Sequence, residues 1–354
     1  MSIRKSLQRL SFDDDVRQRT WRKLAAQLKH DVGLEYALSV MRDRFEERKS
    51  FLLAGVFEDI LRGLRNGESL DVALRDYVPP EELMLIRGGY LSAKLESSLT
   101  LCAKLIDARK AISRAVVSAI AYPLLLITML VVVLIVIALH VMPTLTMLVD
   151  PSTFTGPAAI LHNVSLLVAS QYGLVLLVFL IVTIALIFIS LPKWTGKSRL
   201  LVEGVPPWSI YRLIVGTMWL FTVSTSLQAD IPLVQIMDDM LKNKISPWLR
   251  ERVEAIRLQY TQGKNFGRVL VDTGLHFPDP TMVDDILVYS TLPTFETILH
   301  ALADEWLENG IARVKTQSTI VNTTLLVCIM GVMCCIGMAV ISIQQQLSAN
   351  LGAV

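Results

Sequence analysis

The sequence predicts an all-α membrane protein with two repeated cytoplasmic helical-bundle domains and three transmembrane helices. Apolar residues make up 53% of the 354 residues and charged residues only 19%, a balance that is unusual for a soluble protein. All 34 lysines and arginines lie in residues 1–114 and 193–315. Apolar residues in both charged blocks follow helical spacing, and the alternation typical of strands is absent from their sequences.

The first bundle is expected over residues 1–115. Its opening residues, MSIRKSLQRLSFDDD, lack the apolar core of a secretory signal. We therefore expect the first domain to stay in the cytoplasm and the first span to act as an uncleaved anchor. Further on, Glu81 and Glu82 follow two prolines. This order predicts a helix start, because proline fixes φ and acids favour the positive end of the helix dipole.

A predicted turn shapes this first module. In the stretch NGESLDVAL, Gly67 can end one helix in the left-handed conformation at little cost. Ser69 can cap the next helix by accepting from its free N–H groups. Leu70 and Leu74 then share one helix face, at i and i+4. We assign Gly67, Ser69 and Leu70 to the shape of the module.

Three apolar segments, residues 116–142, 166–191 and 320–343, are predicted to be transmembrane helices. Each is longer than the roughly 20 residues that a helix needs to cross the hydrocarbon core. None contains an acidic or basic residue other than histidine, and Asp150 is the only such residue between the first two. This absence argues against an ion or proton pathway through this chain alone.

The distribution of basic residues predicts the orientation, because lysine and arginine near membrane ends stay on the cytoplasmic side. The connection formed by residues 143–165 has neither residue and should lie outside the cytoplasm. Residues 1–115 and 192–319 should then both be cytoplasmic, and the tail 344–354 should lie outside.

The stretch KWTGKSRL contains Gly-Lys-Ser, the end of a phosphate-binding loop. The full motif needs an earlier glycine between a buried strand and a helix, but Leu191 stands at that position and a long apolar run precedes it. We therefore expect an anchor at the membrane interface rather than a nucleotide site. Its basic and aromatic side chains would contact lipid headgroups: Lys193, Trp194, Lys197 and Arg199.

The second charged block, residues 192–319, is predicted to repeat the first. Three pairs of similar segments follow in the same order at nearly one offset, and an apolar run follows each copy at a similar distance. The pairs are Lys29–Leu38 with Gln228–Met237, Asn66–Leu74 with Gln262–Leu270, and Leu95–Leu99 with Phe295–Leu299.

The repeated turn carries the same local chemistry. Gly263 can end a helix, and Asn265 can cap the helix that follows. Phe266 and Leu270 share a face of that helix, as Leu70 and Leu74 do in the first copy. We assign Gly263, Asn265 and Phe266 to the shape of the second module.

No arrangement of residues indicates catalysis. The five histidines lack metalloprotease spacing, and the four cysteines match no zinc pattern. Asp238 and Asp239 are neighbours, as are Asp284 and Asp285, and side chains of helical neighbours point about 100° apart. Each pair therefore fits a solvated face or a helix start better than a dyad. We predict that the protein is not an enzyme, with no catalytic residue, no cofactor and no nucleic-acid partner.

Tyr122 and Pro123 lie inside the first span, near its cytoplasmic end. A proline there frees a backbone carbonyl and bends the axis, which neighbouring helices can tolerate in a membrane. Two interpretations stand: a simple kink, or a hinge that transmits motion from the bundle to the membrane.

The element Gly-x-[Ser/Asn]-[Leu/Phe]-x-x-x-Leu, present twice, resembles the duplicated domain of the GspF/PilC family. The first span resembles that family too, through AYPLLL (Ala121–Leu126) and MPTL (Met142–Leu145). These are polytopic inner-membrane platform proteins of type II secretion systems and type IV pili. The second copy matches more loosely and lacks the Tyr-Pro pair. The short N-terminus favours a divergent member similar to those of type IVb pili.

This resemblance implies a non-enzymatic platform in the bacterial inner membrane, with a periplasmic loop and tail. Its implied partners are a cytoplasmic hexameric assembly ATPase, a pilin or pseudopilin, and inner-membrane alignment proteins. A homo-oligomer is also expected. The family allows a divalent ion in some first domains, but the ligands cannot be placed in this sequence. Tyr122 and Pro123 are the candidates for coupling the bundle to the membrane.

Two other functions share parts of this pattern. A small transporter or permease subunit would require more spans, broken helices and polar groups at the middle of the membrane. A membrane scaffold or receptor with two helical domains shares the predicted topology but needs no ATPase. Co-purification with a secretion-type ATPase separates these functions from a platform.

Overall fold

The computed structural model describes residues 3–148 and 150–351, and within them the backbone forms helices, turns and loops without a strand. The chain divides into two compact units. The charged unit comprises Met1–Ser113 and Leu191–Ile311, and the apolar unit comprises Arg114–Ser190 and Ala312–Val354. Both copies of the predicted repeat contribute to each unit.

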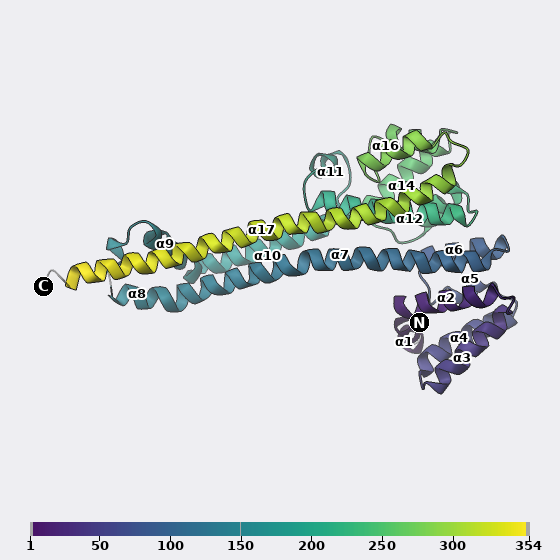
Figure 1. Cartoon of the computed structure of the whole chain (residues 1–354), viewed down its shortest axis with the longest axis horizontal. Helices are drawn as coiled ribbons and strands as arrows, with labels where there is room; N and C mark the ends of the chain where they lie inside the picture. The colour runs from purple at the N-terminus through teal and green to yellow at the C-terminus, as the bar shows by residue number, and fades with distance from the viewer. Residues whose placement is uncertain (1–2, 149, 352–354) are drawn as a thin grey trace. The chain divides into compact units, whose positions relative to one another are not determined.

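The first half of the charged unit packs short helices around one aromatic core. Phe12 lies with its ring centroid 5.9 Å from those of both Trp21 and Phe57, and all three side chains are buried. Helices α3 and α4 lie side by side (Figure 1). The elements are α1 (Ile3–Ser11), α2 (Asp14–Leu28), α3 (Leu34–Glu47), α4 (Phe51–Arg65), α5 (Leu70–Leu74), α6 (Pro80–Leu91) and the start of α7 (Leu95–Val136).

The second half of the charged unit has its own aromatic core. The ring of Phe277 lies 4.9 Å from that of Trp219 and 5.6 Å from that of Trp248. The elements are α11 (Lys197–Val202), α12 (Trp208–Gln228), α13 (Leu233–Lys242), α14 (Pro247–Tyr260), α15 (Phe266–Asp272), α16 (Pro280–Tyr289) and the start of α17 (Phe295–Leu351).

The apolar unit contains the apolar parts of α7 and α17 together with α10 (Gln171–Lys193). One end of it has a small core in which Ile137, Phe154 and Ala339 are buried. The connection predicted as a loop is largely helical, and a break at Ser170 places the start of α10 later than the predicted span. The connecting elements are a π-helical turn η1 (Ile137–Val141), α8 (Met142–Leu148), a 3-10 turn η2 (Pro151–Thr153) and α9 (Pro157–Ala169).

Four helical segments in the described residues are long and apolar enough to cross a membrane, one more than the sequence predicted. The additional one is α12, whose apolar window is 61% buried, whereas that of α10 is 0% buried. Thr217, Leu220 and Val223 of α12 all lie inside the second bundle. The core of that bundle therefore accounts for the apolar character of α12 without a lipid environment.

Candidate functional site

The turns predicted to shape the two modules have matching backbone geometry. Gly67 has φ +84° and Gly263 has φ +82°, a region that L side chains rarely adopt. A second pair of turns also matches, because Asp31 and Asp230, 199 residues apart, have φ 58° and 59°. Such agreement at non-glycine positions indicates that the backbones of the two copies follow the same course through these turns.

The caps that follow the glycines differ. The side chain of Asn265 accepts a hydrogen bond from the Gly267 N–H at 3.0 Å and donates one to the Ser290 carbonyl at 2.6 Å. Ser69 occupies the equivalent N-cap position with extended backbone, but its hydroxyl makes no capping bond. The prediction of a hydroxyl cap is therefore wrong at Ser69. Beyond the two caps, Leu70 and Phe266 are both buried.

The first module encloses a glutamate that the sequence analysis did not single out as a buried group. Glu82, on α6, is fully buried. It accepts a hydrogen bond from the Trp21 indole N–H at 2.7 Å and one from Arg17 Nε at 3.3 Å. Arg17 also donates to the Phe12 carbonyl at 2.7 Å. Burial raises the pKa of the Glu82 carboxyl, while the Arg17 charge and the Trp21 bond oppose that shift.

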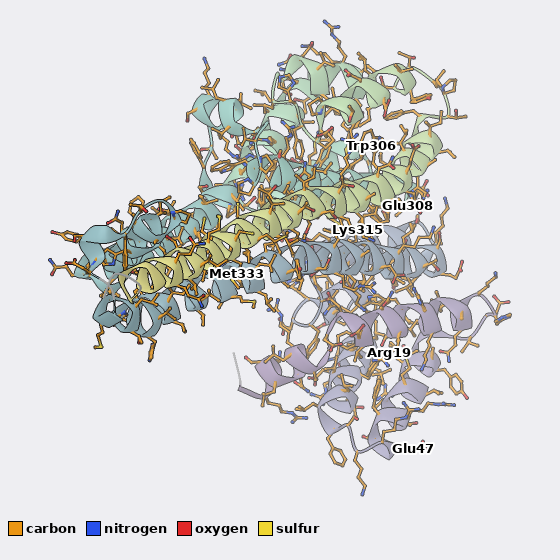
Figure 2. The ribbon with its side chains drawn as sticks, turned by 60° about the vertical axis from the view of Figure 1, so that its left-hand side comes forward. Arg19, Glu47, Trp306, Glu308, Lys315 and Met333 are labelled. Carbon is orange, nitrogen blue, oxygen red and sulfur yellow. The ribbon has the colours of Figure 1, made fainter. Side chains whose placement is uncertain are left out.

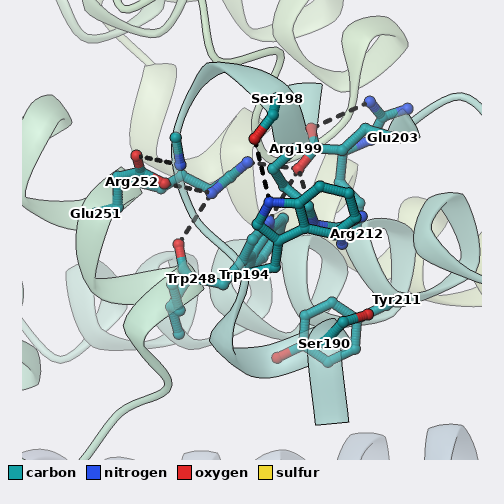
Figure 3. Close-up of polar contacts among 12 residues, drawn as sticks. Ser190, Trp194, Ser198, Arg199, Glu203, Tyr211, Arg212, Trp248, Glu251 and Arg252 are labelled. Carbon is teal, nitrogen blue, oxygen red and sulfur yellow. Dashed lines mark hydrogen bonds and ion pairs between the residues drawn. The ribbon is translucent and has the colours of Figure 1, made fainter. Parts of the chain in front are cut away.

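The second module encloses a buried glutamate at a different place in the repeat. Glu203, which follows α11, accepts from the Trp248 indole N–H at 2.8 Å and from Arg252. Arg212 lies 3.7 Å from Glu203 and equally far from Asp279. Figure 3 shows Glu203, at the end of α11, close to Arg212 of α12 and to Trp248 and Arg252 of α14. The carboxylate therefore joins three helices in the core of the bundle.

Arg199 belongs to this buried cluster, which corrects its prediction as a membrane-interface anchor. Its side chain is 0% exposed and its guanidinium makes no hydrogen bond to the described residues. Its Nε lies 3.9 Å from Glu203, and its guanidinium carbon lies 5.9 Å from the centroid of the Trp248 ring. Burial lowers the pKa of Arg199, and Glu203 opposes that shift.

The other predicted anchors lie at the surface of the charged unit. Lys193 and Lys197 are exposed. The half-buried Trp194 donates from its indole N–H to Ser198 Oγ at 3.2 Å (Figure 3). The Gly196 N–H, which would face a phosphate in a nucleotide site, donates instead to Glu251 at 3.0 Å. The contacts of the two lysines with lipid headgroups remain a prediction.

The coupling candidates lie within α7, which continues through Pro123. Proline has no N–H, so the carbonyl of Ala119, four residues earlier, loses its helical donor. The hydroxyl of Ser318, on α17, donates to that carbonyl at 3.0 Å. Asn322 donates in turn to Ser318 Oγ at 3.4 Å. Tyr122 is 46% exposed.

No metal site emerges from the part of the chain that the structure describes. Within residues 3–148 and 150–351, no three histidine, cysteine, aspartate or glutamate side chains gather closely enough to hold a metal ion. The buried carboxylates are instead paired with arginine and tryptophan, an arrangement that holds helices together.

Comparison with known proteins identifies both copies. The family described as "Type II secretion system, protein F" matches residues 20–143 and 219–343. These stretches together cover more than two thirds of the chain and begin 199 residues apart, which confirms the predicted duplication. The chain is also 25% identical, over 291 residues, to "Toxin coregulated pilus biosynthesis protein E" of Vibrio cholerae serotype O1. That match covers 81% of this chain and 84% of the relative.

Proposed function

The chain belongs to the type II secretion system protein F family, and from this premise we propose that it is a non-enzymatic inner-membrane platform. It would couple a cytoplasmic hexameric assembly ATPase to extraction and polymerisation of pilin or pseudopilin subunits. The observation that carries the proposal is the family match on both copies. The similarity to a toxin coregulated pilus biosynthesis protein favours a pilus over a secretion system, in keeping with a type IVb-like member.

The proposed topology has three spans, in α7, α10 and α17, with both bundles cytoplasmic. It keeps α12 out of the membrane because a large part of its surface is already buried. Reporter fusions after Asp150 and Gln346 should then be periplasmic, and those after Arg75 and Lys264 cytoplasmic. A cytoplasmic signal after Asp150 would overturn this topology.

The platform role requires an ATPase partner. The full chain, purified in detergent together with the assembly ATPase of its own system, should retain that ATPase. Deleting the chain should abolish pili while leaving the ATPase and the pilin at normal levels. A chain that is needed for pili but never associates with the ATPase would instead be a membrane scaffold. Homo-oligomers, pilin contacts and inner-membrane alignment proteins belong to the same proposal and can be tested in the same purification.

A further inference from the structure

A groove of about 460 Å³ runs along α2 and α3 in the first module. Its lining residues on α2 recur at helical spacing along one face, as do those on α3. Apolar side chains including Val16, Met41 and Phe45 line it together with four cations, and its lining contains no acidic residue. The cations are Arg19, Lys23, Arg44 and Arg48.

Several other cations of the same module are engaged in ion pairs. Lys5 pairs with Asp76, Arg42 with Glu58, and Arg109 with Glu81. In contrast, none of the four groove cations forms a side-chain ion pair within residues 3–148 and 150–351, and all four are exposed. Arg19 donates only to the backbone carbonyl of Asp15. Figure 2 labels Arg19 on α2 and Glu47 at the end of α3.

The groove is long enough to hold a helical segment. The lining of α2 extends from Val16 to Gln27, about 16 Å along a helix axis. That length accommodates about three turns of a helix.

We propose that this groove binds an acidic, amphipathic helical segment of the assembly ATPase. The apolar floor would take the apolar face of the segment, and the four cations would face its carboxylates. A concave groove fits a rod-like segment better than it fits a flat bilayer surface. The inference rests on the proposed function, since it names where the ATPase of that platform docks.

The test measures binding of the cognate ATPase to the full chain in nanodiscs. The groove variant carries Lys23→Glu, Arg44→Glu and Arg48→Glu. A control variant carries Lys29→Glu, Arg65→Glu and Arg75→Glu, an identical charge change at exposed positions of the same module that do not line the groove. The groove variant should bind at least about tenfold more weakly, and the control should bind like the wild type. Raising salt should weaken wild-type binding more than binding of the groove variant.

A milder variant with glutamine at Lys23, Arg44 and Arg48 guards against misfolding. It should unfold at the wild-type temperature and still bind more weakly than the control. Overlapping peptides of about 15 residues, tiled along the ATPase, should include an acidic one that binds the wild type and not the groove variant. Peptides that bind both proteins equally would contradict the proposal.

The outcomes separate the two proposals. If the wild type binds no ATPase, the proposed coupling fails and the groove assignment fails with it. If the wild type and the groove variant bind the ATPase equally, the groove assignment is wrong and the platform function stands. If the groove variant keeps the ATPase but loses binding to phosphatidylglycerol vesicles, the groove is a lipid site and the proposal is overturned.

Discussion

Ala119 and Ser318 stand 199 residues apart, the offset that separates the two copies of the repeat, and they meet through a 3.0 Å hydrogen bond. The equivalent helices of the two copies thus touch at equivalent positions within the apolar unit. At the same offset, Asn322 stands where the first copy has Pro123, and it donates to Ser318. The second copy therefore supplies a donor for the carbonyl that proline leaves free in the first.

Ser318→Ala should destabilise the protein more where Pro123 is present than where alanine replaces it. Removing the hydroxyl leaves the Ala119 carbonyl without a donor in apolar surroundings, and bonds of this kind are worth about 0.6–1.7 kcal/mol. Pro123→Ala restores the helical N–H, so Ser318→Ala should cost less in that background, where only the bond from Asn322 is lost. Thermal unfolding of the wild type, both single variants and the double variant in detergent measures this coupling. Equal losses in the two backgrounds would contradict it.

The buried arginines of the second module should differ in their contribution to stability. Arg252 donates to Glu203 and to the Trp248 carbonyl, so Arg252→Met should cost about 3–5 kcal/mol. Arg199→Met should change stability by less than about 1 kcal/mol, because the Arg199 guanidinium makes no hydrogen bond to the described residues and its removal relieves a desolvation cost. Denaturant unfolding of the two variants, followed by tryptophan fluorescence, compares them. A loss for Arg199→Met as large as that for Arg252→Met would refute this difference.

Glu82 should make the stability of the first module depend on pH. Its folded-state pKa is raised, chiefly by burial. Its contribution is therefore fully present below the unfolded-state pKa of about 4.3 and is lost as pH rises through the folded-state value. Relative to the wild type, Glu82→Gln should gain stability as pH increases from about 4 to 7. Unfolding temperatures of the full chain in detergent across this range test the sign, and Glu81→Gln, at the half-buried neighbouring position of α6, is the control. A constant difference between Glu82→Gln and the wild type would reject it.

Local backbone chemistry was the most predictable part of the fold. Gly67 and Gly263 are glycines at helix ends, and nearest neighbours decide that geometry. The fourth apolar helix was harder to predict. The apolar residues of α12 form part of a protein core, and hydropathy does not distinguish a lipid environment from a protein interior. Its serines and threonines, and Arg212 near its N-terminal end, are the signals that could have identified it as a bundle helix.

The buried ionic clusters were not predictable from spacing. Glu203 and Trp248 are 45 residues apart, and only the packing of α11 against α14 brings them together. Arg199 was misassigned because it belongs to the same basic stretch as the exposed Lys193 and Lys197. Successive side chains of a helix point in different directions, so neighbours in sequence can differ in burial. Ser318, in contrast, carried a signal. It is a hydroxyl residue at the entrance of an apolar run, at the repeat offset from the carbonyl that Pro123 frees.

The coupling hypothesis leads to a functional prediction for Pro123→Ala. The substitution restores a backbone hydrogen bond within α7 and removes the need for Ser318 as a donor, so the two helices would no longer be tied at this position. If Pro123 acts as a hinge, the variant should insert in the membrane and bind the ATPase normally, yet assemble few pili. Leu124→Ala changes an exposed neighbour in the same turn and should leave pilus number unchanged. Pilus counts by electron microscopy, at matched protein levels, provide the measurement. Wild-type pilus numbers from a stably expressed Pro123→Ala protein would show that the proline is only a structural kink, and the platform function would still stand.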